Sequence, residues 1–399
     1  MTIGTTSVRQ LLLRRKEILF NFGFIVTVPL IFRFLGDRAI ALAEPVGFGG
    51  LVARLAGRGG WTDIGWEVVS ARALVDPNFS AYAPLSVLDP LIGMGWPADQ
   101  ANSHPPFGIP PFILLALLDY EWWLPFWITG SVIALALSMR ALNVEAWVAY
   151  PVAFAFSITF SGLFALQSTY PLSAVLLALA WRWRHRPLLG GLTLAGYGVG
   201  RGYGLILLIY PFLRRRWSLL IVATGTVVFL TATAWLLEPA VFASFLTQGR
   251  ESIETNLSRG DLITPLSLAS QRGIPDLLVY LAAGLAAALM LWRKQHLFWV
   301  LTWFSFAITP IAWYHSAVVG IPLLVVLWRT SVVGRMAVIL TAGAFAATTT
   351  YMSYSWLVLV LTSGFVLLWN KQSNSDDPSH EAGYVRASAS QRNEVQRSA

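Results

Sequence analysis

The sequence predicts an all-α protein that crosses a membrane many times. Of its 399 residues, 56% are hydrophobic and only 12% are charged, whereas roughly 25% are charged in a soluble domain. Long apolar runs recur along the chain, and a helix can carry such a run through lipid because it satisfies its own backbone polar groups. A soluble globular enzyme is therefore excluded. The absence of cysteine excludes disulfides and thiol catalysis.

The N-terminal region predicts a first membrane span. Residues 1–16 carry a basic cluster and are expected to lie in the cytoplasm. An apolar run from about 17 to 35 follows and opens a transmembrane domain over residues 17–370. No cleavage site of the signal-peptide type is apparent after this run, so we expect the span to be retained.

A large first extracytoplasmic loop is predicted over residues 36–123. Its first part, to about residue 106, is rich in Gly, Pro and Asp and contains no spanning run. The apolar piece 107–118 is too short to span, because a dozen helical residues cover roughly 18 Å of a hydrocarbon core that is about 30 Å thick. We therefore expect an interfacial helix over 107–118, lying on the outer membrane surface.

Eleven further apolar runs complete a prediction of about twelve transmembrane helices. The Ser-, Asn- and charge-rich segment 371–399 is predicted to be a disordered cytoplasmic tail. The runs lie near 124–139, 147–163, 170–181, 188–200, 203–213, 217–236, 275–292, 297–312, 314–328, 336–350 and 352–369.

The distribution of charge supports an orientation with both termini in the cytoplasm. In that orientation 19 of the 28 Lys and Arg residues lie inside, while 14 of the 20 Asp and Glu residues lie outside. Every short cytoplasmic turn is then basic, as the positive-inside rule requires. If 107–118 spanned the membrane, the Arg-rich turns at 182–186 and 214–216 would lie outside. The net charge of +8 is thus an orientation signal, and no nucleic-acid partner is expected.

Two acidic residues of the first loop are candidates for a general base. Asp63 lies between Trp61 and Trp66, an aromatic setting that is common in carbohydrate sites. It could take a proton from an acceptor hydroxyl, or it could cap a helix that runs to about Leu74. Glu67 lies one helical turn further on and could be the base in its place.

Arg201 and two histidines are further candidates on the same face. Arg201 lies between Gly200 and Gly202, and it could clamp a lipid phosphate or extend to the interface as an unpaired arginine. His315 follows a proline-marked span end, where a bond to a backbone carbonyl is the structural alternative to a functional role. His104 is a weaker candidate of the same kind. No metal-binding or nucleotide-binding motif occurs in the sequence, so neither a metal nor a cofactor is expected.

Six segments, in their order along the chain, resemble the motifs of one family. They are Asp63 with the following TDIGWE context, His104-Pro105-Pro106-Phe107, Leu166-Gln167-Ser168, the LTLAGYGVGR stretch that ends at Arg201, Asn256-Leu257-Ser258, and Pro310 to His315. The order resembles the GT-C superfamily of polyprenyl-phosphate-sugar-dependent glycosyltransferases, and within it the GT87 (DUF2029) family. Arg201 replaces the lysine that is usual there, Tyr314 replaces one histidine of a pair, and about twenty extra residues precede Asp63.

The resemblance implies transfer of a hexose, with mannose favoured, at the outer face of the plasma membrane. The donor would be a polyprenyl-phosphate sugar, and the acceptor an extracytoplasmic glycolipid or glycan. It implies that Asp63 is the catalytic base, with His315 beside it. Donor-phosphate and substrate contacts are expected from Arg201, Gln167, Arg259, Asn256, His104 and Glu67.

Two other functions remain as alternatives. A lipid-linked sugar flippase or transporter would need polar residues along a path through the bilayer, whereas the polar residues here gather on one face. An envelope polysaccharide polymerase or ligase would have its large external loop late in the chain, whereas the longest loop here is the first.

Overall fold

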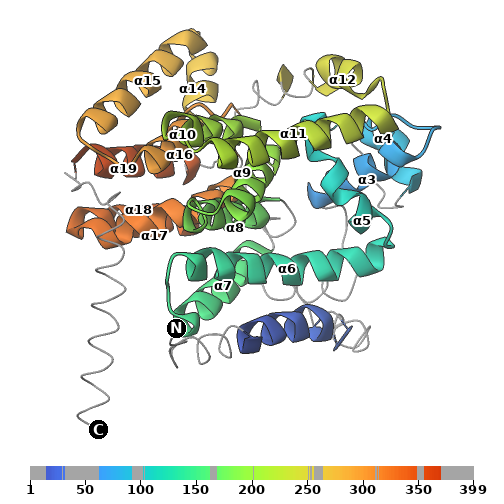
Figure 1. The fold of residues 1–399 in the computed structure, drawn as a ribbon, viewed down its shortest axis with the longest axis horizontal. Coiled ribbons are helices and arrows are strands. Elements are labelled where there is room, and N and C mark those ends of the chain that lie inside the picture. The colour runs from blue at the N-terminus through green and yellow to red at the C-terminus, as the bar shows by residue number, and fades with distance from the viewer. Residues whose placement is uncertain are drawn as a thin grey trace.

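The computed structural model describes residues 15–28, 30–31, 63–91, 102, 104–161, 169–200, 202–249, 251, 254–255, 264–310, 312, 314–347 and 355–369. Within these ranges the regular structure is helical and no strand occurs (Figure 1). The all-α fold class is therefore confirmed for this part of the chain. The predictions for 1–14 and for the tail 371–399 lie outside the described residues.

The helices lie where the apolar runs predict them. The first run is helical over 15–28 and 30–31. Two later runs each begin as a 3-10 helix, so that η5 (Gly202–Leu208) leads into α10 (Ile209–Leu213) and η7 (Tyr314–Gly320) into α17 (Ile321–Thr330). The other runs form α6 (Tyr120–Ala141), α7 (Ala146–Ser161), α8 (Tyr170–Arg182), α9 (Pro187–Gly200), α11 (Trp217–Leu237), α15 (Asp276–Trp292), α16 (Leu297–Ala307), α18 (Val332–Ala347) and α19 (Ser355–Trp369).

Two of the described helices are long and apolar enough to cross a membrane by themselves. They are Trp122–Ala141, within α6, and α11. The other apolar helices have 10–17 residues each, which is shorter than the roughly 20 residues of a typical span. The helical character of the predicted runs is thus confirmed, whereas the number of about twelve spans stays a prediction.

α11 has the surface of a lipid-facing helix. Its side chains Ile221, Phe229 and Leu236 are 69%, 68% and 72% exposed, and an apolar surface of this kind is stable in contact with lipid rather than water. Exposed tryptophans lie near both ends, at Trp217 and Trp235. The 18 residues that separate them correspond to about 27 Å of helix, close to the thickness of a hydrocarbon core.

The predicted interfacial segment is a chain of short turns. It consists of η2 (Pro106–Gly108), η3 (Pro110–Phe112) and α5 (Ile113–Ala116), because its prolines lack the N–H that a regular helix needs. The segment is two-sided: Ile109 is fully buried, while Leu114 is 79% and Leu117 is 72% exposed. This is the pattern of an interfacial helix, and its position at a membrane surface stays a prediction.

The first loop forms a small helical unit at one end of α6 and α11 (Figure 1). Its helices are α3 (Asp63–Val75), α4 (Leu85–Leu88) and η1 (Asp89–Leu91), and α3 packs against η3 and α5. Glu238, which caps the end of α11, accepts hydrogen bonds from the Ser80 hydroxyl (2.8 Å) and the Ala81 amide (3.0 Å). These bonds fix the first loop to the end of α11.

Glycines let α9 approach its neighbours closely. A Cβ atom at Gly191 would lie 2.7 Å from the Val222 side chain of α11, and one at Gly190 would lie 2.4 Å from the Trp183 carbonyl oxygen. Real Cβ contacts are not this short, so both positions require glycine. Small residues at a helix interface allow such close approach of two backbones.

The substitution Gly191→Ala should destabilise the bundle by about 1–3 kcal/mol, because the new methyl group forces α9 and α11 apart. Gly225→Ala is the matched control. Gly225 lies in α11, the helix that Gly191 of α9 packs against, and a Cβ atom at Gly225 would meet nothing within 4 Å. It should be neutral or slightly stabilising, because alanine favours a helix. Thermal unfolding in detergent measures both, and equal shifts for the two variants would contradict the packing argument.

Candidate functional site

The structure describes the candidate site residues to different extents. Glu67 and His104 are described with their side chains. Asp63 is the first residue of α3 and His315 is the second of η7, and for these two only the backbone is described. The remaining candidates lie outside the described residues: Gln167, Arg201, Asn256 and Arg259.

Glu67 and His104 form a buried contact. Glu67 lies on α3 and is 3% exposed, and its carboxylate faces the Nδ1 atom of His104 in an ion-pair contact. The His104 side chain is 36% exposed, so one side of the imidazole is open. The two residues are far apart in the sequence, and their contact holds the start of η2 against α3. The helix places Glu67 one turn after Asp63, on the same face.

Asn102 fixes the backbone that carries His104. Its side-chain oxygen accepts a hydrogen bond from the His104 amide (2.9 Å), and its side-chain nitrogen donates to the Ser70 hydroxyl (3.0 Å). Asn102 and Ser70 are both buried. The bond from Asn102 to the amide two residues later is typical of asparagine turns, and this signal in Asn-Ser-His could have identified the residue in the sequence.

Tyr82 holds the other side of the His104 backbone. The Tyr82 hydroxyl donates a hydrogen bond to the His104 carbonyl oxygen. Burial raises the pKa of Tyr82, and the nearby carboxylates of Glu67 and Glu238 raise it further. The hydroxyl therefore stays protonated and available as a donor over the whole physiological pH range.

Arg72 joins α3 to the end of the interfacial segment. Its guanidinium donates to the carbonyl oxygens of Ala116 (2.7 Å) and Leu118 (2.6 Å), and also to that of Leu91. Burial lowers the pKa of Arg72, while the charge of Asp119 opposes this effect. Arginine keeps its charge at neutral pH, so one cation satisfies three carbonyls at the end of a helical turn. The sequence analysis did not single out Arg72.

One cluster of buried side chains contains neighbours of four candidate residues. Ile64 follows Asp63 directly, and Ile109 lies five residues after His104. Tyr170 lies three residues after Gln167, and Val318 lies three residues after His315. The four side chains thus belong to one continuous core, which also extends along α6 to Met139. Direct contacts join α8 to η7 and η2 to α9.

The end of α9, directly before Arg201, reaches the same region. A Cβ atom at Gly108 of η2 would lie 3.3 Å from the Val199 carbonyl oxygen, and one at Gly200 would lie 3.2 Å from the Ser173 hydroxyl of α8. The last turn of α9 is therefore in close contact with both η2 and α8.

The chain before His315 is tied to the end of the loop that contains Asn256 and Arg259. The Thr264 hydroxyl, at the start of α14 (Pro265–Gln271), donates to the Pro310 carbonyl oxygen (3.1 Å). Among the described residues, no group of three or more His, Asp or Glu side chains could hold a metal ion.

Comparison with known proteins identifies the class. Residues 103–296 match the family model described as Glycosyltransferase family 87. This match confirms the resemblance to the GT-C superfamily and to family 87 that the sequence motifs show, and it indicates a glycosyltransferase. The family and the apolar helices together indicate a membrane protein. No curated protein and no solved structure matches this chain.

The matched region contains part of the candidate site. His104, Gln167, Arg201, Asn256 and Arg259 fall within residues 103–296. The α3 residues and His315 fall outside it. The association of α3 with the matched region rests on the contacts of Glu67 and Arg72 with η2 and α5.

A double-mutant cycle with Glu67→Gln and His104→Asn should show a coupling energy of about 1–3 kcal/mol in unfolding, because the imidazole is in direct contact with a buried carboxylate. Thermal unfolding of the wild type, the two single variants and the double variant measures the coupling. The control cycle uses Glu17→Gln and Arg140→Gln, an ion pair at 3.0 Å whose Glu17 side chain is 26% exposed, against 4% for the Glu67 side chain. Its coupling should stay below about 1 kcal/mol. A Glu67–His104 coupling no larger than the control would contradict the assignment.

Proposed function

We propose that this glycosyltransferase moves a hexose, with mannose favoured, from a polyprenyl-phosphate donor to an extracytoplasmic glycolipid or glycan acceptor, with inversion. A series of contacts carries the proposal: it joins α3 to the segment before η2, η2 to the end of α9, the end of α9 to α8, and α8 to η7. These are the chain positions at which the family-like motifs occur. Arg201, Gln167 and His315 would then act with Asp63 in one site.

The surroundings of this region suit a lipid-borne donor. The exposed leucines of the interfacial segment, Leu114, Leu117 and Leu118, lie on the same short unit as the Arg72 contacts. A polyprenyl chain is an apolar ligand that can lie against such side chains while its phosphate stays at the interface. The site would lie on the extracytoplasmic side of the plasma membrane, with both termini in the cytoplasm.

The proposed reaction is a single displacement. An acceptor hydroxyl attacks the anomeric carbon of the donor sugar and gives its proton to a carboxylate. The bond between the anomeric carbon and the phosphate oxygen breaks, and polyprenyl phosphate leaves with the bonding electrons. Attack from the opposite face converts a β-linked donor into an α-linked product.

Asp63 is the better assignment for the base. Glu67 is 3% exposed and its carboxylate is already in contact with His104, so its position suits holding η2 against α3. Asp63 lies one turn earlier, at the first residue of α3. The proposal therefore gives proton transfer to Asp63 and positioning to Glu67 and His104.

The phosphate of the donor would be bound by cations. A guanidinium can form two parallel hydrogen bonds with a phosphate, and this role belongs to Arg201 with help from Arg259. Such cations also stabilise the charge that develops on the leaving phosphate in the transition state. Gln167, Asn256 and His315 would orient the sugar or the phosphate.

The variant Asp63→Asn should lower kcat by at least about a hundredfold, because the carboxylate that accepts the proton is lost. Sugar transfer from a radiolabelled polyprenyl-phosphate donor by purified protein measures the effect. The control is Asp76→Asn, a substitution of the same kind in the same loop, where the new side chain can still accept the hydrogen bond from the Asn78 amide. If Asp63→Asn turns over like the control, while Glu67→Gln is inactive and folded, Glu67 is the base.

Arg201→Ala should raise the apparent KM for the donor by about tenfold or more, since a charge-assisted contact to phosphate is lost. Arg201→Lys should recover part of the loss, because lysine is the usual residue of the family motif. Arg272→Ala, at an exposed arginine on the same predicted face, is the control. An unchanged donor KM in Arg201→Ala would exclude the phosphate contact.

An assay in proteoliposomes distinguishes the proposed transferase function from a flippase function. With labelled donor and a lipid acceptor extract on the outside, the proposed function yields a labelled glycan product. Movement of the donor across the bilayer without any product would support the alternative function.

A further inference from the structure

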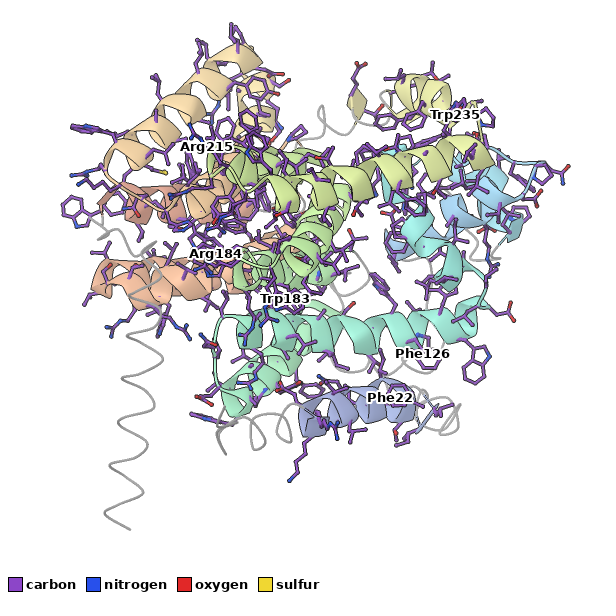
Figure 2. All side chains as sticks on the ribbon, viewed as in Figure 1. Phe22, Phe126, Trp183, Arg184, Arg215 and Trp235 are labelled. Atoms are coloured by element: carbon purple, nitrogen blue, oxygen red, sulfur yellow. The ribbon has the colours of Figure 1, made fainter. Side chains whose placement is uncertain are left out.

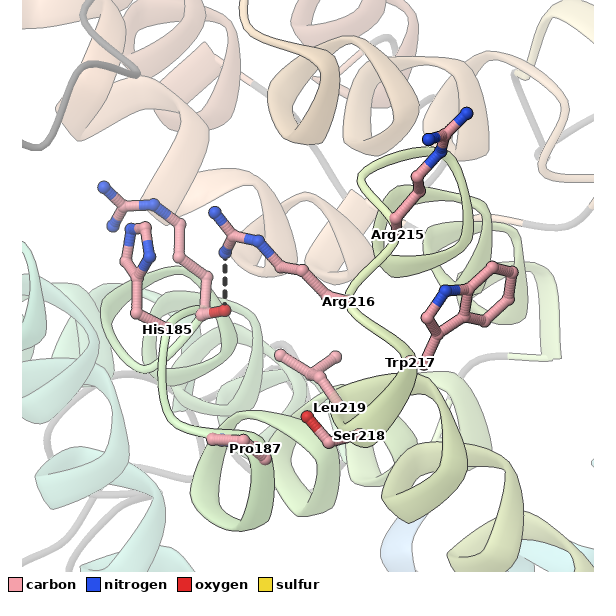
Figure 3. A pocket seen from close by; sticks show the side chains of 8 residues that line it. His185, Pro187, Arg215, Arg216, Trp217, Ser218 and Leu219 are labelled. Atoms are coloured by element: carbon pink, nitrogen blue, oxygen red, sulfur yellow. Dashed lines mark hydrogen bonds between the residues drawn. The ribbon is translucent and has the colours of Figure 1, made fainter.

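A pocket of about 370 Å³ lies at the opposite ends of α8, α9 and α11 from the candidate site (Figure 3). This volume is in the range of roughly 300–1,000 Å³ that is common for small-ligand sites. Figure 2 shows Arg184 and Arg215 near this end and Trp235 near the other end of α11. The pocket is lined by Arg184, His185, Pro187, Arg215, Arg216, Trp217, Ser218 and Leu219.

The lining of the pocket is cationic. Three arginines and one histidine contribute to it, and none of the eight lining residues is an Asp or Glu. Arg184 is 8% exposed, and its guanidinium lies 3.9 Å from the centre of the Trp181 ring. The Arg184 guanidinium also donates to the Trp181 carbonyl oxygen (3.0 Å). A lining that contains three arginines and no Asp or Glu favours an anionic ligand.

Arg216 connects the two turns that form the pocket. One of its terminal nitrogens donates to the Arg184 carbonyl oxygen (2.6 Å), as the dashed line in Figure 3 shows. Its guanidinium also lies over the Tyr210 ring, 5.4 Å from the ring centre. A guanidinium has five N–H donors, so a single bond to the protein is compatible with a bidentate contact to a phosphate. Arg216 is therefore fixed in place as a cation at the wall of the pocket.

The first turn of α11 adds backbone donors. The amide of Leu220 makes the first helical bond of α11, to the Arg216 carbonyl oxygen. The three amides before it in α11 have no acceptor within the helix. The residues that carry them, Trp217, Ser218 and Leu219, line the pocket. The positive end of the helix dipole of a 21-residue helix thus lies beside the arginines.

Apolar side chains flank the pocket. Leu188 on α9 is 61% exposed, and on α11 Trp217 is 52% and Ile221 is 69% exposed. In a membrane these side chains would contact acyl chains, while the arginines would lie at headgroup depth. A ligand with a phosphate and apolar chains matches both parts of this surface.

We propose that this pocket is a binding site for a phosphate group, carried by an anionic phospholipid of the cytoplasmic leaflet. The site lies at the other end of α11 from the candidate catalytic residues, about 31 Å away along the helix for its 21 residues. Its existence does not depend on the proposed sugar transfer. A lipid bound here would hold the Arg184 and Arg216 turns together and so stabilise the packing of α9 on α11.

The test titrates the full-length protein in neutral detergent with short-chain phosphatidylglycerol, and in separate arms with short-chain phosphatidylcholine and with inorganic phosphate at matched ionic strength. The thermal unfolding midpoint is the readout. Phosphatidylglycerol should raise the midpoint of the wild type at low concentration. Arg216→Gln and Arg215→Gln should each need about tenfold more lipid for half of the shift.

Lys294→Gln is the matched control, because Lys294 is also a basic residue with a positive φ, 63° against 51° for Arg215, on the same predicted face but outside the pocket. It should respond like the wild type. Ser218→Leu narrows the pocket without changing its charge, and it should also weaken the lipid response. The Ser218→Leu variant therefore tests the pocket even if Arg216→Gln fails to fold.

The arms distinguish the possible sources of the phosphate. A response to phosphatidylglycerol alone that depends on Arg215 and Arg216 supports the lipid. An equal, arginine-dependent response to inorganic phosphate supports a phosphate site with a soluble ligand and overturns the lipid assignment. The proposal is wrong if the pocket variants respond like Lys294→Gln, or if phosphatidylcholine acts as strongly as phosphatidylglycerol.

Discussion

The contact between the buried Glu67 carboxylate and the His104 imidazole is the constraint on which the arrangement of the candidate site depends. It joins α3 to the segment that leads into η2, and Asn102 and Tyr82 hold the backbone of His104 on either side of it. η2 in turn touches the last turn of α9. Through this series of contacts, α3 of the first loop is fixed beside the last turn of α9.

α11 connects the first loop at one end to the arginine-lined pocket at the other. Its C-terminal end is fixed to the first loop by Glu238, and its N-terminal end forms the arginine-lined pocket. Its length and its exposed apolar surface suit a membrane span. If α11 spans the bilayer, the candidate catalytic residues and the phosphate pocket lie on opposite faces. Chemistry on a lipid-linked sugar and the binding of a structural phospholipid would then be separated by the whole membrane.

The candidate site was partly predictable from sequence. Asp63, His104 and Arg201 could be chosen because charged or titratable residues near membrane spans are costly and are seldom kept without a role. Arg72 and Asn102 could not be chosen in this way, because their roles consist of bonds to carbonyl oxygens and hydroxyls of residues distant in the sequence. The pairing of Glu67 with His104 likewise required the packing of α3 on the interfacial segment.

The sequence by itself determined the helical class, the positions of the helices and the family 87 type, because hydropathy and motif order are local properties of the chain. It also indicated that the segment at 107–118 is too short to span a membrane. Only the tertiary structure decided which ends of the helices meet. It brought Ile64, Ile109, Tyr170 and Val318 into one buried cluster, and it turned two basic turns into a pocket. Apolar burial makes these choices through long-range contacts, which no local pattern of residues specifies.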